Sequence, residues 1–95
     1  YILSNFPGDQ FDIYASKHQF INEFDDMIIS GKVGLKKPDK KIYQLALQKF
    51  HCKPETTLFI DDRPENTLSA NELGIQTINL DRPEKLKEYL KNFTF

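Results

Sequence analysis

Two adjacent carboxylates follow a short apolar run in the segment Leu58–Asn66. The run Leu58-Phe59-Ile60 reads as a strand, and Asp61 and Asp62 come directly after it, ahead of Pro64. In open parallel sheets, ligand sites gather beyond the carboxyl ends of the strands. Two acids placed there repel each other, and a hard cation such as Mg2+, which prefers carboxylate oxygens, relieves that repulsion. The alternative is a solvent-exposed turn in which one of the carboxylates caps the next helix.

Two further polar positions lie at the ends of expected elements. Ser4 and Asn5 follow the apolar run Tyr1-Ile2-Leu3, and Lys37 lies just before the start of an expected helix. A hydroxyl and backbone N–H groups can hold an anion there, and a lysine supplies a compact positive charge for a phosphate. Anion donor, ammonium and metal together form a clamp suited to phosphoryl transfer, and we expect them at one rim of a sheet. Otherwise Ser4 only satisfies a strand end, and Lys37 belongs to a solvated lysine-rich face.

The elements that must position these groups alternate along the chain. Apolar runs predict strands at residues 1–3, 27–29, 58–60 and 76–80. Helices are expected after a cap at Asp9 and as far as Phe24, from Pro38, from Pro64 to Gly74, and after a capping box of Asp81 and Glu84. Residues 30–37 are expected to be a loop. Strict alternation favours an α/β fold, a doubly wound parallel sheet with helices on its faces.

A length of 95 residues limits the chain to one small domain, residues 1–95. Its apolar fraction of 39% supplies a core, and its net charge of −1 provides no general attraction to nucleic acid or to an anionic membrane. The single cysteine excludes an internal disulfide and fits a reducing compartment, so we expect a cytoplasmic protein. No stretch approaches the roughly 20 apolar residues of a membrane span.

Three segments, in this order, resemble the haloacid dehalogenase (HAD) superfamily of hydrolases. They are Ile2–Asn5, the Gly-x-x-Lys-Pro-Asp-x-x-Ile-Tyr segment ending at Tyr43, and the hydrophobic-Asp-Asp-x-x-x-Asn-x-x-x-Ala segment ending at Ala70. The chain looks most like the subfamily with a helical cap, which includes phosphatases of small phosphorylated metabolites. The resemblance implies a HAD core, which is a Rossmann-like three-layer sandwich, and Mg2+ as cofactor.

The resemblance also assigns roles to single residues. It implies that the Ser4 hydroxyl binds the transferring phosphoryl group and that Asn5 lines the same pocket. It implies that Lys37 holds the phosphate and the nucleophilic carboxylate. Asp62 matches the principal magnesium ligand, and Asp61 a neighbouring or water-mediated ligand. At Asn66 many relatives have another acid, so the resemblance gives Asn66 no clear metal role.

One departure concerns the family's nucleophile. The Asp-x-Asp motif that carries it occurs nowhere in these 95 residues. In the family this motif lies on the first strand, which is followed by the cap, and that strand lies between the strands corresponding to 1–4 and 57–60. We therefore expect the chain to be the C-terminal portion of a larger hydrolase, inactive alone on a small phosphate ester. Two strand edges would then be open to pairing with another chain.

Three other functions fit part of the pattern. A 2-haloacid dehalogenase belongs to the same superfamily, but those relatives work without a metal and lack the acid pair. A response-regulator receiver also combines paired acids, a hydroxyl and a lysine, but it places the acid pair early and the lysine late. The third is a non-catalytic binding domain, which would have no reason to keep Ser4, Lys37 and Asp62. The substrate, oligomeric state and source are not encoded in these motifs.

Overall fold

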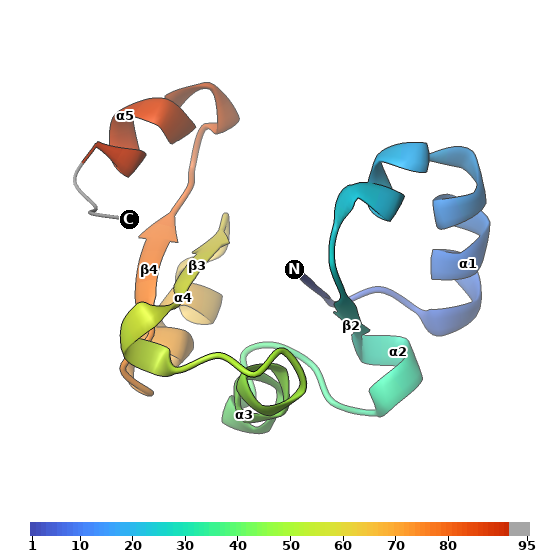
Figure 1. Ribbon diagram of the computed structural model, residues 1–95, viewed down its shortest axis with the longest axis horizontal. Helices are drawn as coiled ribbons and strands as arrows, with labels where there is room; N and C mark the ends of the chain where they lie inside the picture. The colour runs from blue at the N-terminus through green and yellow to red at the C-terminus, as the bar shows by residue number, and fades with distance from the viewer. Residues whose placement is uncertain (92–95) are drawn as a thin grey trace. The chain divides into compact units, whose positions relative to one another are not determined.

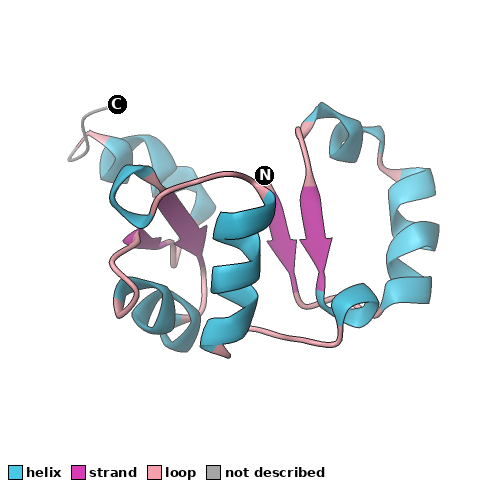
Figure 2. Cartoon of the chain, turned by 60° about the horizontal axis from the view of Figure 1, so that its bottom comes forward, coloured by secondary structure: helices cyan, strands magenta, loops and turns pink. Residues whose placement is uncertain are grey.

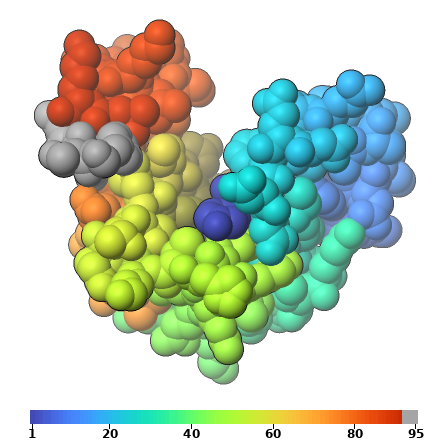
Figure 3. Space-filling model, viewed as in Figure 1, coloured from blue at the N-terminus to red at the C-terminus, as the bar shows by residue number. Residues whose placement is uncertain are grey.

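The computed structural model describes residues 1–91 and divides the chain into two compact units, Tyr1–Cys52 and Lys53–Phe95. Figures 1 and 3 colour the first unit from blue to green and the second from yellow-green to red. Helices alternate with strands along the chain, which confirms the α/β class. Each unit holds one pair of parallel strands, drawn in magenta in Figure 2.

The first unit is built on two short strands. It contains β1 (Ile2–Ser4), α1 (Gly8–Lys17), η1 (Gln19–Glu23), β2 (Met27–Ile29), α2 (Ser30–Val33) and α3 (Lys40–Lys49). Strands β1 and β2 run parallel, with Leu3 opposite Ile28 in the register. A core of Phe11, Ile21 and Ile29 joins helix α1, the 3-10 turn η1 and strand β2. Strand β2 is therefore anchored by apolar packing, and Ile2 of β1 packs against the same core.

Helix α1 differs from the expected helix at both ends. Its N-cap residue is Pro7, whose carbonyl accepts from the Phe11 N–H at 2.8 Å, and Asp9 lies in the first turn instead of capping it. The acid still suits the positive end of the helix dipole. The helix ends at Lys17, so Ile21 lies in η1 and Phe24 beyond it. Phe11 of α1 and Ile21 of η1 pack in the same core, which explains why the sequence suggested a single helix.

The segment before α3 is also more ordered than expected. Residues 30–33 form the short helix α2 in place of a loop, and Gly34 ends it with a left-handed φ of 76°. Helix α3 begins at Lys40, so Pro38 lies outside it, contrary to the expectation. Its cap is Asp39, whose side chain accepts from the Lys41 N–H at 2.9 Å. An aspartate cap satisfies an N–H at the helix start, which a proline side chain cannot do.

The second unit repeats the parallel arrangement. It contains η2 (Pro54–Thr56), β3 (Leu58–Asp61), α4 (Pro64–Asn71), β4 (Gln76–Asn79), η3 (Pro83–Lys85) and α5 (Leu86–Leu90). Strands β3 and β4 run parallel, with Asp61 opposite Asn79 at the end of the register. Helix α4 packs against both strands, and Ala70, Ile75 and Ile78 are buried. The carboxyl end of β3 and the start of α4 are thereby held together.

The limits of α4 confirm one expectation and correct another. Pro64 opens the helix as predicted, because its missing N–H costs nothing at that position. The helix ends at Asn71, and Gly74 supplies the left-handed turn, with φ of 86°, that leads into β4. The predicted capping box at Asp81 is wrong. The Asp81 carboxylate accepts instead from the Tyr89 hydroxyl at 2.8 Å, and the 3-10 turn η3 precedes α5.

The four strands do not form one continuous sheet. Within residues 1–91, β1 pairs with β2 and β3 pairs with β4, so each strand has one edge that no described strand covers. None of the helices in this part of the chain combines the length and apolar character needed to cross a membrane.

Candidate active site

Ser4 and Asn5 lie at the carboxyl end of β1. Ser4 is the last residue of the strand, half-buried and opposite Ile29 in the register with β2. Asn5 follows it in the loop that leads to α1 and is exposed. The fold therefore places the hydroxyl at a strand end, as the apolar run before it predicted.

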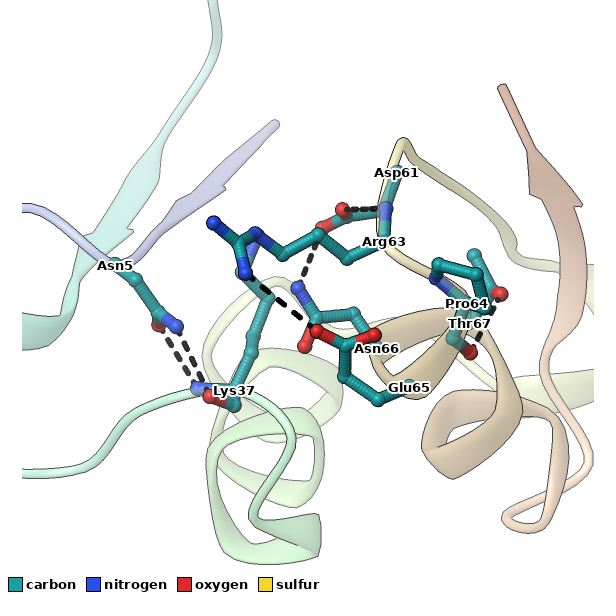
Figure 4. Close-up of polar contacts among 8 residues, drawn as sticks. All are labelled: Asn5, Lys37, Asp61, Arg63, Pro64, Glu65, Asn66 and Thr67. Carbon is teal, nitrogen blue, oxygen red and sulfur yellow. Dashed lines mark hydrogen bonds and ion pairs between the residues drawn. The ribbon is translucent and has the colours of Figure 1, made fainter. Parts of the chain in front are cut away.

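Lys37 is brought to the same loop by the side chain of Asn5. The Asn5 amide nitrogen donates to the Lys37 carbonyl at 2.9 Å, and the Lys37 N–H donates to the Asn5 amide oxygen at 2.8 Å (Figure 4). The peptide bond from Lys37 to Pro38 is cis. The first unit thus joins two of the predicted site positions, although they are far apart in the sequence.

Lys37 also differs from the lysines around it. It is half-buried, whereas the neighbouring lysines Lys32, Lys36, Lys40 and Lys41 are exposed. Lys32 has a structural partner of its own, because its ammonium lies 2.6 Å from the Asp12 carboxylate. The alternative of a solvated lysine-rich face therefore fits the exposed neighbours, but it does not explain why Lys37 is half-buried.

The two carboxylates of the acid pair have different environments in the second unit. Asp61 ends β3, and one of its carboxylate oxygens accepts from the Arg63 N–H at 2.9 Å. Its other oxygen accepts from the Asn66 amide nitrogen at 3.3 Å (Figure 4). Asp62 is exposed, and its carboxylate makes no hydrogen bond or ion pair with the residues that the structure describes. Asp61 therefore organises the turn, and Asp62 is the carboxylate open to a ligand.

Asn66 is a member of this site that the sequence left without a role. It lies in the first turn of α4 and is only 3% exposed, and its amide reaches back to the Asp61 carboxylate. An acid at this position would repel Asp61, whereas an amide N–H stabilises it. The sequence could have indicated this contact, because Asn66 lies five residues after Asp61 and in the first turn of the helix that begins at Pro64. Arg63 lies outside the helix, and its guanidinium is 3.6 Å from the Glu65 carboxylate.

The donor set fits a hard divalent cation but does not complete its coordination. Asp61 and Asp62 offer carboxylate oxygens, which Mg2+ prefers, and Mg2+ usually takes only one or two carboxylates and keeps several waters. Among residues 1–91, no group of three or more His, Cys, Asp or Glu side chains could hold a metal ion. The remaining ligands would have to be water, substrate oxygens or groups from outside these residues.

These features define a class of α/β proteins with polar groups at the carboxyl ends of parallel strands. The chain belongs to the haloacid dehalogenase-like hydrolase family, whose model matches residues 2–80. The match spans both units and includes Ser4, Lys37 and the acid pair. The family resemblance that the sequence motifs indicated is therefore confirmed.

Two curated relatives show how the similarity is distributed. The chain is 44% identical over 62 residues to acyl-CoA dehydrogenase family member 10 of Mus musculus, covering 65% of the chain and 6% of that protein. It is 29% identical over 80 residues to the sesquiterpene phosphatase astK of Aspergillus oryzae, covering 84% of the chain and 41% of that protein. The chain thus matches less than half of the length of either relative.

A HAD family enzyme from Bacteroides thetaiotaomicron has a similar structure. A variant of that enzyme in complex with magnesium and inorganic phosphate superposes with a TM-score of 0.79 at 23% identity, covering 93% of the chain and 49% of the enzyme. The wild-type complex gives a TM-score of 0.67 at 27% identity over 74% of the chain and 35% of the enzyme. The parallel α/β fold is therefore that of HAD hydrolases.

Proposed function

We propose that this chain is part of a magnesium-dependent phosphatase that acts on a small phosphorylated metabolite. The reaction would pass through an aspartyl-phosphate whose nucleophile is supplied by a segment outside these 95 residues, together with the cap. The uncovered edges of β1 and β3 are consistent with a further strand, because an unpaired edge presents N–H and C=O groups to a partner. On this basis the 95 residues alone would not turn over a phosphate ester.

Each site residue has a separate task in this proposal. The Ser4 hydroxyl donates to a phosphoryl oxygen, and Lys37 neutralises phosphate charge and that of the attacking carboxylate. Asn5 lies beside them. Asp62 would hold Mg2+, with Asp61 next to it, and the cation when bound would neutralise charge that develops on the transferring phosphoryl group.

The observation that carries the proposal is the difference between the two acids. Asp61 receives two hydrogen-bond donors of its own turn, whereas the adjacent Asp62 carboxylate is exposed and receives none from residues 1–91. A carboxylate at the end of a parallel strand and without a protein partner suits a cation. The names of two relatives support the same chemistry, since one is a phosphatase and the other was crystallised with magnesium and phosphate.

The experiment uses the complete protein, including the segment that carries Asp-x-Asp, with an aryl phosphate as substrate. We expect turnover in Mg2+, its loss in excess EDTA, and a fall of at least about 100-fold for Asp62→Asn. The matched control is Asp25→Asn, which makes the same change in charge at an exposed aspartate before β2 and should leave turnover unchanged.

Three results would contradict the proposal. Turnover that persists in EDTA would exclude a metal-dependent reaction. Release of halide from a 2-haloacid, without phosphate release, would favour the dehalogenase alternative. Turnover by residues 1–95 alone at the rate of the complete protein would show that no outside nucleophile is needed.

A further inference from the structure

The Asn5 side-chain amide forms hydrogen bonds with both the backbone N–H and the backbone carbonyl of Lys37. Its amide nitrogen donates to the Lys37 carbonyl at 2.9 Å, and its amide oxygen accepts from the Lys37 N–H at 2.8 Å. Both distances lie in the range of good N–H···O bonds. Figure 4 shows the two bonds side by side between the loop after β1 and the segment before α3. A pair of bonds to one residue restricts its backbone more than either bond alone.

These two hydrogen bonds restrain the backbone of Lys37, on which the position of its ammonium depends. A lysine ammonium lies at the end of a flexible four-carbon side chain. Its position therefore depends on the orientation of the lysine backbone. Lys37 lies between the left-handed turn at Gly34 and the helix cap at Asp39, outside regular structure. The two bonds from Asn5 connect this irregular segment to the end of β1, next to Ser4.

We propose that Asn5 is a positioning residue, which orients Lys37 toward the anion rather than binding the anion itself. The inference rests on the proposed function of Lys37. The amide oxygen and one N–H of Asn5 are engaged with Lys37, so at most one N–H is left for a phosphate. The competing role is the phosphate-binding one, in which Asn5 lines the pocket and contacts the phosphate directly, as the family resemblance suggests.

Hydrogen exchange in the complete protein tests the restraint without any turnover. Asn5→Ala removes the acceptor of the Lys37 N–H, so that amide should exchange on the order of 10-fold faster. Asn5→Asp keeps the acceptor for the Lys37 N–H but loses the donor to the Lys37 carbonyl, so its exchange rate should lie between those of the wild type and Asn5→Ala. The amide of Ile28, a buried residue of β2, serves as the internal reference for the fold. Equal Lys37 exchange rates in all three proteins would overturn the inference.

A double-mutant cycle separates positioning from direct binding. The measured quantity is the dissociation constant for inorganic phosphate in the presence of Mg2+, determined by calorimetry on the complete protein. Asn5→Ala should weaken phosphate binding about 5- to 10-fold when Lys37 is present and less than about 2-fold in the Lys37→Ala background, because coupled residues are not additive. A direct phosphate ligand would lower the affinity by the same factor in both backgrounds.

The outcomes distinguish this inference from the proposed function. Equal factors in the two backgrounds overturn the positioning role of Asn5 and leave the proposed role of Lys37 intact. Unchanged phosphate affinity in Lys37→Ala overturns the proposed role of Lys37, and the inference with it. A loss confined to the background that contains Lys37, together with faster Lys37 amide exchange in Asn5→Ala, supports both.

Discussion

Removing each carboxylate of the acid pair in turn should separate their roles, because Asp61→Ala should lower the stability of the fold and Asp62→Ala should remove metal binding with little change in stability. Asp61→Ala deletes the acceptor for the Arg63 N–H at 2.9 Å, a loss comparable to that of a helix cap, about 1 kcal/mol. It also deletes the acceptor for the nearly buried Asn66 amide at 3.3 Å, about another 1 kcal/mol. The free energy of unfolding should therefore fall by about 2 kcal/mol. Asp62→Ala removes no hydrogen bond or ion pair within residues 1–91 and should change the free energy of unfolding by less than about 0.5 kcal/mol.

The assay is urea denaturation of the complete protein in EDTA, because a bound cation would add its own stabilisation. Metal binding is measured in a second series with increasing Mg2+, as the shift of the urea unfolding midpoint. We expect Mg2+ to stabilise the wild type and to have no measurable effect on Asp62→Ala. The two variants remove the same functional group from neighbouring residues, so each is the control for the other.

Two results would refute this reasoning. If Asp62→Ala destabilises the metal-free protein as much as Asp61→Ala does, Asp62 has a structural role that the geometry does not show. If Mg2+ stabilises Asp62→Ala as strongly as the wild type, the cation is held elsewhere. Either result would remove the observation on which the proposed function depends.

The remaining predictions concern packing and ionisation. Gly31→Ala should lower the free energy of unfolding by at least about 2 kcal/mol in urea denaturation, because the added Cβ would collide with the Gly8 backbone nitrogen, and a smaller loss would contradict this close approach. Ile42→Ala should cost about 2–5 kcal/mol in the same assay, since Ile42 is 0% exposed; a cost below 1 kcal/mol would argue against its burial. The Tyr89 hydroxyl lowers the pKa of Asp81 from 3.8, so this bond stabilises the fold above that pH and less as the pH falls through the lowered pKa. Tyr89→Phe should return the pKa of Asp81 toward 3.8 in an NMR titration, and an unchanged pKa would show that the bond does not form in solution.

The same hydrogen bond acts on the tyrosine in the opposite direction. The Asp81 carboxylate raises the pKa of the Tyr89 hydroxyl above 10.0, since ionisation would remove the donor and place two negative charges together. The hydrogen bond between Tyr89 and Asp81 therefore stabilises the fold below pH 10, and this stabilisation is lost as the pH rises through the raised pKa of Tyr89.

The order of elements could be predicted because local patterns specify it. Pro64 marked the start of α4, and the apolar run ending at Ile60 marked β3. Where the prediction failed, a polar side chain had a different hydrogen-bonding role from the one that the local pattern suggested. Asp81 bonds to Tyr89 instead of capping a helix, and Asp39 rather than Pro38 defines the start of α3. Short polar side chains have several hydrogen-bond partners within reach, and the sequence does not show which one the fold selects.

The sequence alone determined the family, the alternation of helices and strands, and the residue types available for anion and metal binding. These depend on composition and spacing, which are one-dimensional properties. Only the tertiary structure decided that the Asn5 side chain is hydrogen-bonded to Lys37, 32 residues away, and that the Asn66 side chain is hydrogen-bonded to Asp61. It also decided that two neighbouring aspartates differ, because hydrogen-bond geometry depends on the direction in which each side chain leaves the backbone, and adjacent residues of the same type leave it in different directions.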